Sequence, residues 1–217
     1  MDRLTITTFT DPMMGLTYEM EPTYEQLADA FPQLELRWVM GLLVRDVSDF
    51  MLHGETIPEY NGRLARIYES EQAIGGLPIS MPDLRLFDEE HRSSLPLNLA
   101  YKAAQLADRD KADLFLWNLR HATVVDVLPT THLDELLKVV RATGIDEGEF
   151  TRHYEDGSAQ RELEGDLALR QKLGIHALPA CMVSYGKKAV LVRGVLGYDE
   201  FVGIIAELTD GRVTPAR

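Results

Sequence analysis

The amino-acid sequence predicts an α/β fold into which a large all-helical segment is inserted. Three observations support this prediction. Residues 1–45 follow a strand, helix, strand pattern, and residues 46–156 have helical spacing throughout. Residues 157–217 contain a helix, two short apolar runs of period two and a closing helix. We therefore expect the first and last segments to form one α/β domain, interrupted by a helical insertion domain.

The N-terminal segment begins with a predicted strand. In "RLTITTFT", residues 3–10, apolar and β-branched side chains alternate, and the run ends at Asp11 and Pro12. Proline lacks a backbone N–H and suits the first turn of a helix, so a helix should follow directly. The alternating run "LELRWVMGLL", residues 34–43, is then the second strand.

The middle segment reads as a series of helices whose apolar residues recur three and four positions apart. One of them opens with Thr131 three residues before Asp134, the spacing of a capping box, and closes at Gly144. The predicted helical segments are residues 57–76, 95–124 (two helices), 130–144, 144–154 and 158–174.

The C-terminal segment returns to a period of two. "LPACMVSY" and "KKAVLVRG" are apolar runs joined by Gly186 and Lys187, which predicts a tight hairpin. The closing helix, "YDEFVGIIAEL", has apolar residues on one face.

Composition excludes several classes of function. The chain of 217 residues has 22 Lys plus Arg against 35 Asp plus Glu, a formal charge of -13, so no positive surface for nucleic acid is expected. No apolar run has the length of a membrane span, and the first residues lack a signal-peptide pattern, so we expect a cytoplasmic protein with no membrane partner. The one cysteine, Cys181, excludes an intramolecular disulfide.

Three motifs in the predicted order carry a family resemblance. "DPMMGLTY" keeps Asp11, Pro12 and Tyr18 of a motif that otherwise contains two cysteines, "GIHALPACMV" spans residues 174–183, and "SSLPLNLAYKAAQLA" spans residues 93–107. The chain thereby resembles the DsbA-like branch of the thioredoxin superfamily, with FrnE and the hydroxychromene-carboxylate isomerases as relatives. The resemblance implies a thioredoxin-like fold with a helical insertion and a cis proline at position 179.

The chain departs from this family at the reactive positions. The alignment places Met14 and Thr17 where the family has its nucleophilic and resolving cysteines. A thioether has no ionisable proton and forms no mixed disulfide, whereas oxidase and isomerase activities both need a thiolate. Thiol-disulfide exchange at this junction is therefore excluded.

The resemblance implies that a ligand groove remains beside the start of the helix. Unpaired amides there would favour an anion or a thiolate brought by a ligand. Either this groove still binds a ligand, or Met13 and Met14 only fill an inactive site. The implied groove residues are Met13, Met14, Gly15, Leu16, Thr17, Leu178 and Pro179.

Two functions agree with these residues. One is a non-redox binding module without a cofactor, which holds a peptide, a protein partner or a small thiol. The alternative is a glutathione-dependent isomerase or transferase, of the hydroxychromene-carboxylate isomerase or kappa-class type, because there glutathione brings the sulfur. Met14 disfavours the alternative, since it cannot hydrogen-bond a glutathione thiolate.

Single residues give weaker indications. Thr17 carries the only hydroxyl in the motif, and His176 lies near the expected site, so both are candidates for acid-base catalysis. The simpler interpretations are that Thr17 caps a helix or lies at the surface, and that His176 is solvated. Cys181 is expected to be a structural core residue. "DEEH", residues 88–91, is interpreted as a solvated acidic loop. The remaining histidines show no metal-ligand spacing, so no metal site is expected; they are His53, His91, His121, His132 and His153.

Overall fold

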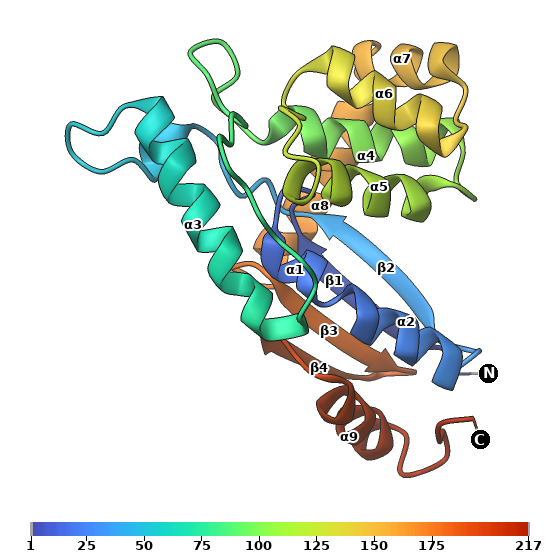
Figure 1. Cartoon of the computed structure of the whole chain (residues 1–217). Coiled ribbons are helices and arrows are strands. Elements are labelled where there is room, and N and C mark those ends of the chain that lie inside the picture. Colours follow the sequence, from blue (N-terminus) through green and yellow to red (C-terminus); the bar gives the residue numbers. More distant parts are fainter. Residues whose placement is uncertain (1, 217) are drawn as a thin grey trace.

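The structure of the protein is a computed structural model that describes residues 2–216 (Figure 1). Its strands are β1 (Leu4–Thr10), β2 (Glu35–Met40), β3 (Ala180–Tyr185) and β4 (Lys188–Arg193). Its helices are α1 (Gly15–Glu19), α2 (Glu21–Ala30), the 3-10 turn η1 (Val47–Asp49), α3 (Ile57–Gly75), α4 (Leu95–Ala107), α5 (Ala112–Val124), α6 (Leu133–Thr143), α7 (Glu147–Glu155), α8 (Ser158–Lys172) and α9 (Tyr198–Leu208).

The strands form a single mixed sheet in the order β2, β1, β3, β4. β1 pairs with β2 in parallel and with β3 antiparallel, and β3 pairs with β4 antiparallel. The predicted hairpin between β3 and β4 is confirmed, and Gly186 adopts the left-handed φ of 59° that its tight turn needs. The two ends of the chain therefore meet in one sheet, as their pattern predicts.

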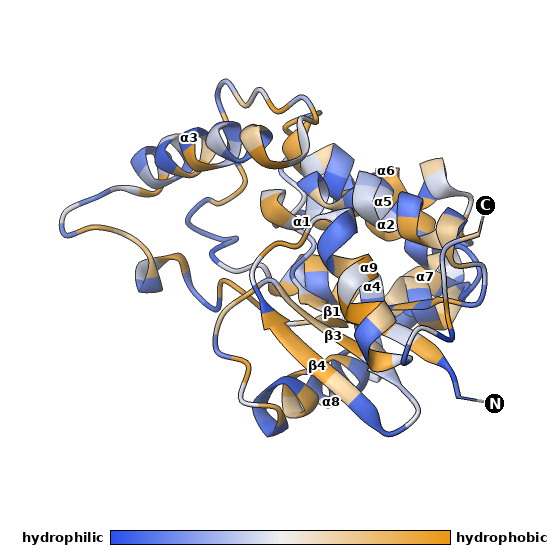
Figure 2. Ribbon diagram, turned by 90° about the horizontal axis from the view of Figure 1, so that it is seen from below, coloured by the Kyte–Doolittle hydropathy of each residue, from blue (hydrophilic) through white to orange (hydrophobic). Residues whose placement is uncertain are grey.

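Both faces of the central strands are covered by helices. On one face Tyr24 of α2 packs edge-on against Trp38, at 5.0 Å between ring centroids, and against Phe201 of α9 at 6.1 Å. On the other face a smaller cluster contains Phe9 and Ile175, and α8 contacts β2. β4 lies at the sheet edge, where Figure 2 shows a hydrophobic centre between hydrophilic ends.

The middle of the chain is helical, as predicted. Figure 1 shows α4 to α7 grouped at one end of the sheet, while α3 runs along its side. α4 contacts α5, α7 and α8, and the rings of Phe115 and Phe150 lie 5.8 Å apart between α5 and α7. None of the helices within residues 2–216 combines the length and apolar composition that a membrane crossing needs. The boundaries 1–45, 46–156 and 157–217 stay predictions.

Two local expectations are wrong. The helix after Pro12 is not continuous, because α1 ends at Glu19 and α2 starts at Glu21. Thr131 forms no capping box for α6, since the helix is preceded by His132 and the Thr131 hydroxyl donates to the Leu86 carbonyl instead. That bond joins the segment before α6 to the loop before α4.

Candidate functional site

Asp11 fixes the junction between β1 and α1. It is fully buried, and its carboxylate accepts hydrogen bonds from the Met13 amide (3.1 Å), the Leu43 amide (2.8 Å), the Ser94 hydroxyl (2.7 Å) and the Asn98 amide group (2.8 Å). Burial raises the pKa of Asp11, while these four donors act to lower it. One carboxylate thus ties the motif to the end of β2 and to α4 of the helical segment.

The two positions that replace cysteines are enclosed. Met14 has only 5% of its surface exposed, and its sulfur lies 3.8 Å from the Thr10 hydroxyl. Thr17 is completely buried, and its hydroxyl shares a 2.7 Å hydrogen bond with that of Thr10. The expectation that Thr17 caps a helix or lies at the surface is wrong, because that bond gives the hydroxyl a place inside the junction.

A cavity of about 230 Å³ opens beside the motif. Five of the seven expected groove residues line it: Met13, Met14, Gly15, Leu16 and Leu178. Thr17 and Pro179 do not. α3 forms the opposite wall with residues that include Tyr60, Leu64, Ile67, Tyr68 and Glu71. The cavity therefore lies between the motif and the helical segment.

Leu178, which lines this cavity, has backbone groups without hydrogen-bonding partners among the described residues. The Leu178–Pro179 peptide bond is cis. The Pro179 carbonyl accepts a hydrogen bond from the Gly194 amide at 2.9 Å, whereas neither the amide nor the carbonyl of Leu178 has a hydrogen-bonding partner in residues 2–216. Buried or half-buried backbone groups are normally paired, so Leu178 offers a free donor and a free acceptor beside the cavity.

Glu71 is the functional residue that sequence reasoning missed. It comes from α3, lies against Gly15 at the start of α1, and its carboxylate accepts a hydrogen bond from the Leu16 amide. Burial and the negative charge of Glu19 raise the pKa of Glu71 to about 7. One of its oxygens, Oε2, is buried and has no hydrogen-bonding partner among the described residues.

A signal for Glu71 exists in the sequence. The buried face of α3 includes Tyr60, Leu64 and Tyr68, which recur every four residues. The next turn of the same face falls at residues 71 and 72, where the sequence has Glu and Gln. A carboxylate that interrupts an apolar stripe is a candidate for a buried, perturbed group.

The other two single-residue candidates lie elsewhere. His176 is exposed and lines a separate cavity with Leu42 and Arg170, and it does not line the cavity beside Met14. Cys181 is buried, with its sulfur 3.4 Å from the Tyr24 hydroxyl, and burial raises the pKa of its thiol. A buried, protonated thiol is a structural residue rather than a nucleophile.

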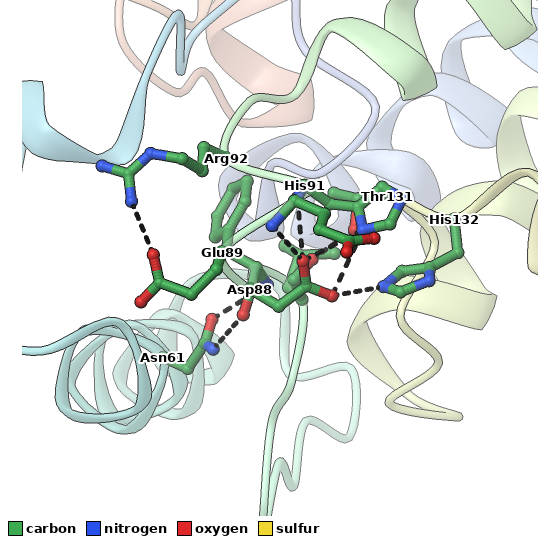
Figure 3. Close-up of polar contacts among 10 residues, drawn as sticks. Asn61, Asp88, Glu89, His91, Arg92, Thr131 and His132 are labelled. Atoms are coloured by element: carbon green, nitrogen blue, oxygen red, sulfur yellow. Dashed lines mark hydrogen bonds and ion pairs between the residues drawn. The ribbon is translucent and has the colours of Figure 1, made fainter.

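Residues 88–91 lie in an exposed or half-exposed loop, and two of their side chains lie next to a histidine from another segment. Asp88 and His91 meet His132, which lies 41 positions further along the chain, and one potential ligand atom from each lies within 4.8 Å of the others. The rings of His91 and His132 stack with centroids 3.8 Å apart (Figure 3). The fold therefore brings together two histidines that show no metal-ligand spacing in the sequence.

Comparison with known proteins identifies the fold. A sequence profile of the family described as Thioredoxin matches residues 7–202. A protein of Nitrosomonas europaea classed as a protein disulfide isomerase superposes with a TM-score of 0.79 at 17% identity, over 97% of this chain and 100% of that one. The cytosolic disulfide reductase DsbM from Pseudomonas aeruginosa superposes with a TM-score of 0.67 at 19% identity, over 95% of each chain. These likenesses confirm the expected fold class.

One curated protein matches by sequence. The ClpXP adapter protein SpxH of Bacillus subtilis (strain 168) is 22% identical over 218 residues, which cover 98% of this chain and 70% of that protein. A second structure of DsbM, solved with GSH, superposes with a TM-score of 0.63 at 19% identity, over 95% of this chain and 96% of that one.

Proposed function

Because this chain belongs to the thioredoxin family, in its DsbA-like branch, and yet has no cysteine at the start of α1, we propose that it is a non-redox binding module. In this proposal it holds an extended segment of a partner protein in the cavity between α1, α3 and Leu178. The observation that carries the proposal is the unpaired backbone of Leu178 beside an apolar cavity. An extended peptide recognises such a backbone by adding its own amide and carbonyl groups.

The cavity is rimmed by exposed apolar side chains. Phe50 and Ile67 both line it, and they are 43% and 42% exposed. Arg63 of α3 donates to the Phe50 carbonyl at 2.8 Å and forms an ion pair with Glu55, which holds the Phe50 loop in place. Exposed apolar side chains around a concave site are typical of surfaces that bind other proteins.

The similarity to SpxH supports a protein as the ligand. SpxH is described as an adapter of ClpXP, and it matches nearly the whole length of this chain. An adapter acts by binding proteins, which agrees with a thioredoxin fold that has lost its thiols at the motif. The identity of the partner, and the cytoplasm as its location, are part of this proposal.

Glu71 disfavours the glutathione-dependent alternative. A glutathione thiolate would approach the amides at the start of α1, yet the Glu71 carboxylate already accepts from the Leu16 amide there. Two anions at one amide repel each other, so a thiolate would have to displace Glu71 or meet it protonated. Met14 offers the thiolate no hydrogen-bond donor in compensation.

A matched pair of substitutions on α3 tests the proposal. Ile67 lines the cavity at 42% exposure, whereas Ile74, two turns further along the same helix, is 48% exposed and does not line it. A fluorescent library of extended hexapeptides is titrated against the wild type, Ile67→Glu and Ile74→Glu. We expect Ile67→Glu to weaken binding by about tenfold or more, or about 1.4 kcal/mol, and Ile74→Glu to leave it unchanged.

The result that contradicts the proposal is equally defined. If no hexapeptide binds, or if both substitutions weaken binding equally, the cavity is not a peptide site. Reduced glutathione is titrated in parallel by thermal shift, because a ligand of the native state raises the melting temperature. A rise with glutathione alone, abolished by Ile67→Glu, would favour the glutathione-dependent alternative.

A further inference from the structure

We propose that Asp88, His91 and His132 form a binding site for one divalent transition-metal ion of the zinc type, with an open coordination position toward a neighbouring cavity. The three side chains come from two segments, the loop before α4 and the residue before α6. His91 Nδ1 lies 3.0 Å from Asp88 Oδ1, and His132 Nε2 lies 2.8 Å from Asp88 Oδ2 (Figure 3). This site is separate from the cavity beside Met14.

The donor set selects the class of metal. Imidazole nitrogens and a carboxylate oxygen are ligands of Zn²⁺, and two histidines with one carboxylate plus an exchangeable ligand are a recurrent open zinc site. Around Zn²⁺, with bonds of about 2.0 to 2.1 Å, tetrahedral ligand atoms lie about 3.3 Å apart. The three ligand atoms already lie within 4.8 Å of one another, so small side-chain rotations suffice.

The backbone of the first ligand segment is held in place by α3. Asn61 donates to the Phe87 carbonyl at 2.7 Å and accepts from the Phe87 amide at 3.2 Å (Figure 3). The Asp88 carboxylate accepts from the backbone amides of Glu90 (2.9 Å) and His91 (2.8 Å) through Oδ1. Oδ2 is thereby directed toward His132, so the carboxylate is oriented before any ion arrives.

The second ligand segment is joined directly to the first. The hydroxyl of Thr131 donates to the Leu86 carbonyl, which fixes the residue before His132 against the residues before Asp88. This is the bond that replaces the expected capping box at α6. Two loops distant in sequence are therefore locked together at the point where their histidines meet.

The neighbouring acidic residue leaves the metal site open. Glu89 pairs with Arg92, at 3.4 Å, and Figure 3 shows it directed away from the two histidines. Asp88 and His132 also line a cavity of about 770 Å³, whose other wall includes Asn61 and Arg66 of α3. A metal held by the three side chains would face this cavity, where water or a nitrogen or oxygen atom of a small molecule completes its coordination.

Direct metal titration tests the assignment. The tag-free chain is stripped with EDTA, dialysed and titrated with Co²⁺, whose visible absorption reports four- or five-coordinate binding, and bound Co²⁺ is then displaced with Zn²⁺. The variants are His91→Gln and His132→Gln. The matched control is His121→Gln, because His121 also lies beside a carboxylate, Asp126, at 3.3 Å but has no second histidine.

We expect one ion per wild-type chain, a loss of affinity of about tenfold or more in His91→Gln and in His132→Gln, and no change in His121→Gln. Zn²⁺ should raise the melting temperature of the wild type and the control but not of the two site variants. A wild type that binds no Co²⁺ or Zn²⁺ overturns the assignment, whatever the folding of the variants. It is also overturned if the site variants bind as the wild type does, or if His121→Gln weakens binding to the same extent.

Discussion

Glu71→Gln should remove a pH dependence of stability that originates at the start of α1. The pKa of Glu71 is raised from 4.5 to about 7 in the folded protein. The folded state therefore binds its proton more tightly than the unfolded state does. The contribution of Glu71 to stability is fully present below about pH 4.5 and is lost as the pH rises through about 7. Glutamine has a similar shape and does not titrate.

The magnitude follows from the size of the pKa change. A difference of 2.5 between 4.5 and about 7 corresponds to an upper value of about 3.4 kcal/mol, at about 1.4 kcal/mol for each pH unit. Because the Glu71 side chain is not completely enclosed, solvent screening reduces this to about 1 to 2 kcal/mol. Repulsion from Glu19 contributes to the raised pKa of Glu71. Arg63 lines the same cavity, but its guanidinium is paired with Glu55 at 2.8 Å instead of with Glu71.

Urea unfolding followed by far-UV circular dichroism measures the effect. The free energy of unfolding is determined for the wild type and Glu71→Gln at pH 5 and pH 8. Between these values the advantage of Glu71→Gln over the wild type should grow by about 1 to 2 kcal/mol. Glu207→Gln on the exposed side of α9 is the control, because its side chain makes no hydrogen bond within residues 2–216.

The outcome that refutes this reasoning is a difference between wild type and Glu71→Gln that stays constant from pH 5 to pH 8. That result would mean that Glu71 titrates as an ordinary solvated carboxylate. A growing advantage of the same size in Glu207→Gln would also refute it, since the effect would then reflect overall charge.

Two further substitutions test the packing around the motif and the sheet. Arg120→Met should destabilise the protein by about 3 to 5 kcal/mol in urea unfolding, because the fully buried guanidinium pairs with the buried Glu21. The double variant Arg120→Met with Glu21→Gln should recover part of the lost free energy of unfolding. A double variant as unstable as Arg120→Met alone would contradict the pairing. Met14→Ala should cost about 2 kcal/mol, the lower end for a buried methionine that borders a cavity, and a cost near zero would show that Met14 does not fill the junction.

The strands were predictable from the sequence because their signal is local. The period of two in β1 comes from side chains that alternate between two buried faces, whereas in β4, at the sheet edge, exposed residues alternate with the half-buried Val190 and Val192. The groove residues were expected only through the family resemblance, and Met14 and Leu178 are among those that line the cavity beside the motif. Thr17 could not be placed, because its burial depends on a hydroxyl partner, Thr10, seven residues earlier.

The residues that escaped prediction are those whose environment is made by distant segments. The pKa of Glu71 is raised because α3 packs against α1. Within its own helix, the interrupted apolar stripe is the one sign of that contact. His132 likewise reaches Asp88 because Thr131 binds Leu86 instead of capping α6. A local motif predicts a cap, but a tertiary partner for the same hydroxyl overrides it.

α3 contributes wall residues to the cavities of both proposed sites. Along its length, residues such as Ile67 and Glu71 line the cavity beside the motif, while Asn61 and Arg66 line the cavity next to His132. Substitutions at the two sites therefore act separately: Ile67→Glu on α3 alters the wall of the cavity beside the motif, and the histidine variants, which lie outside α3, leave that wall intact. The proposal of a peptide site and the proposal of a metal site can therefore be tested independently of each other.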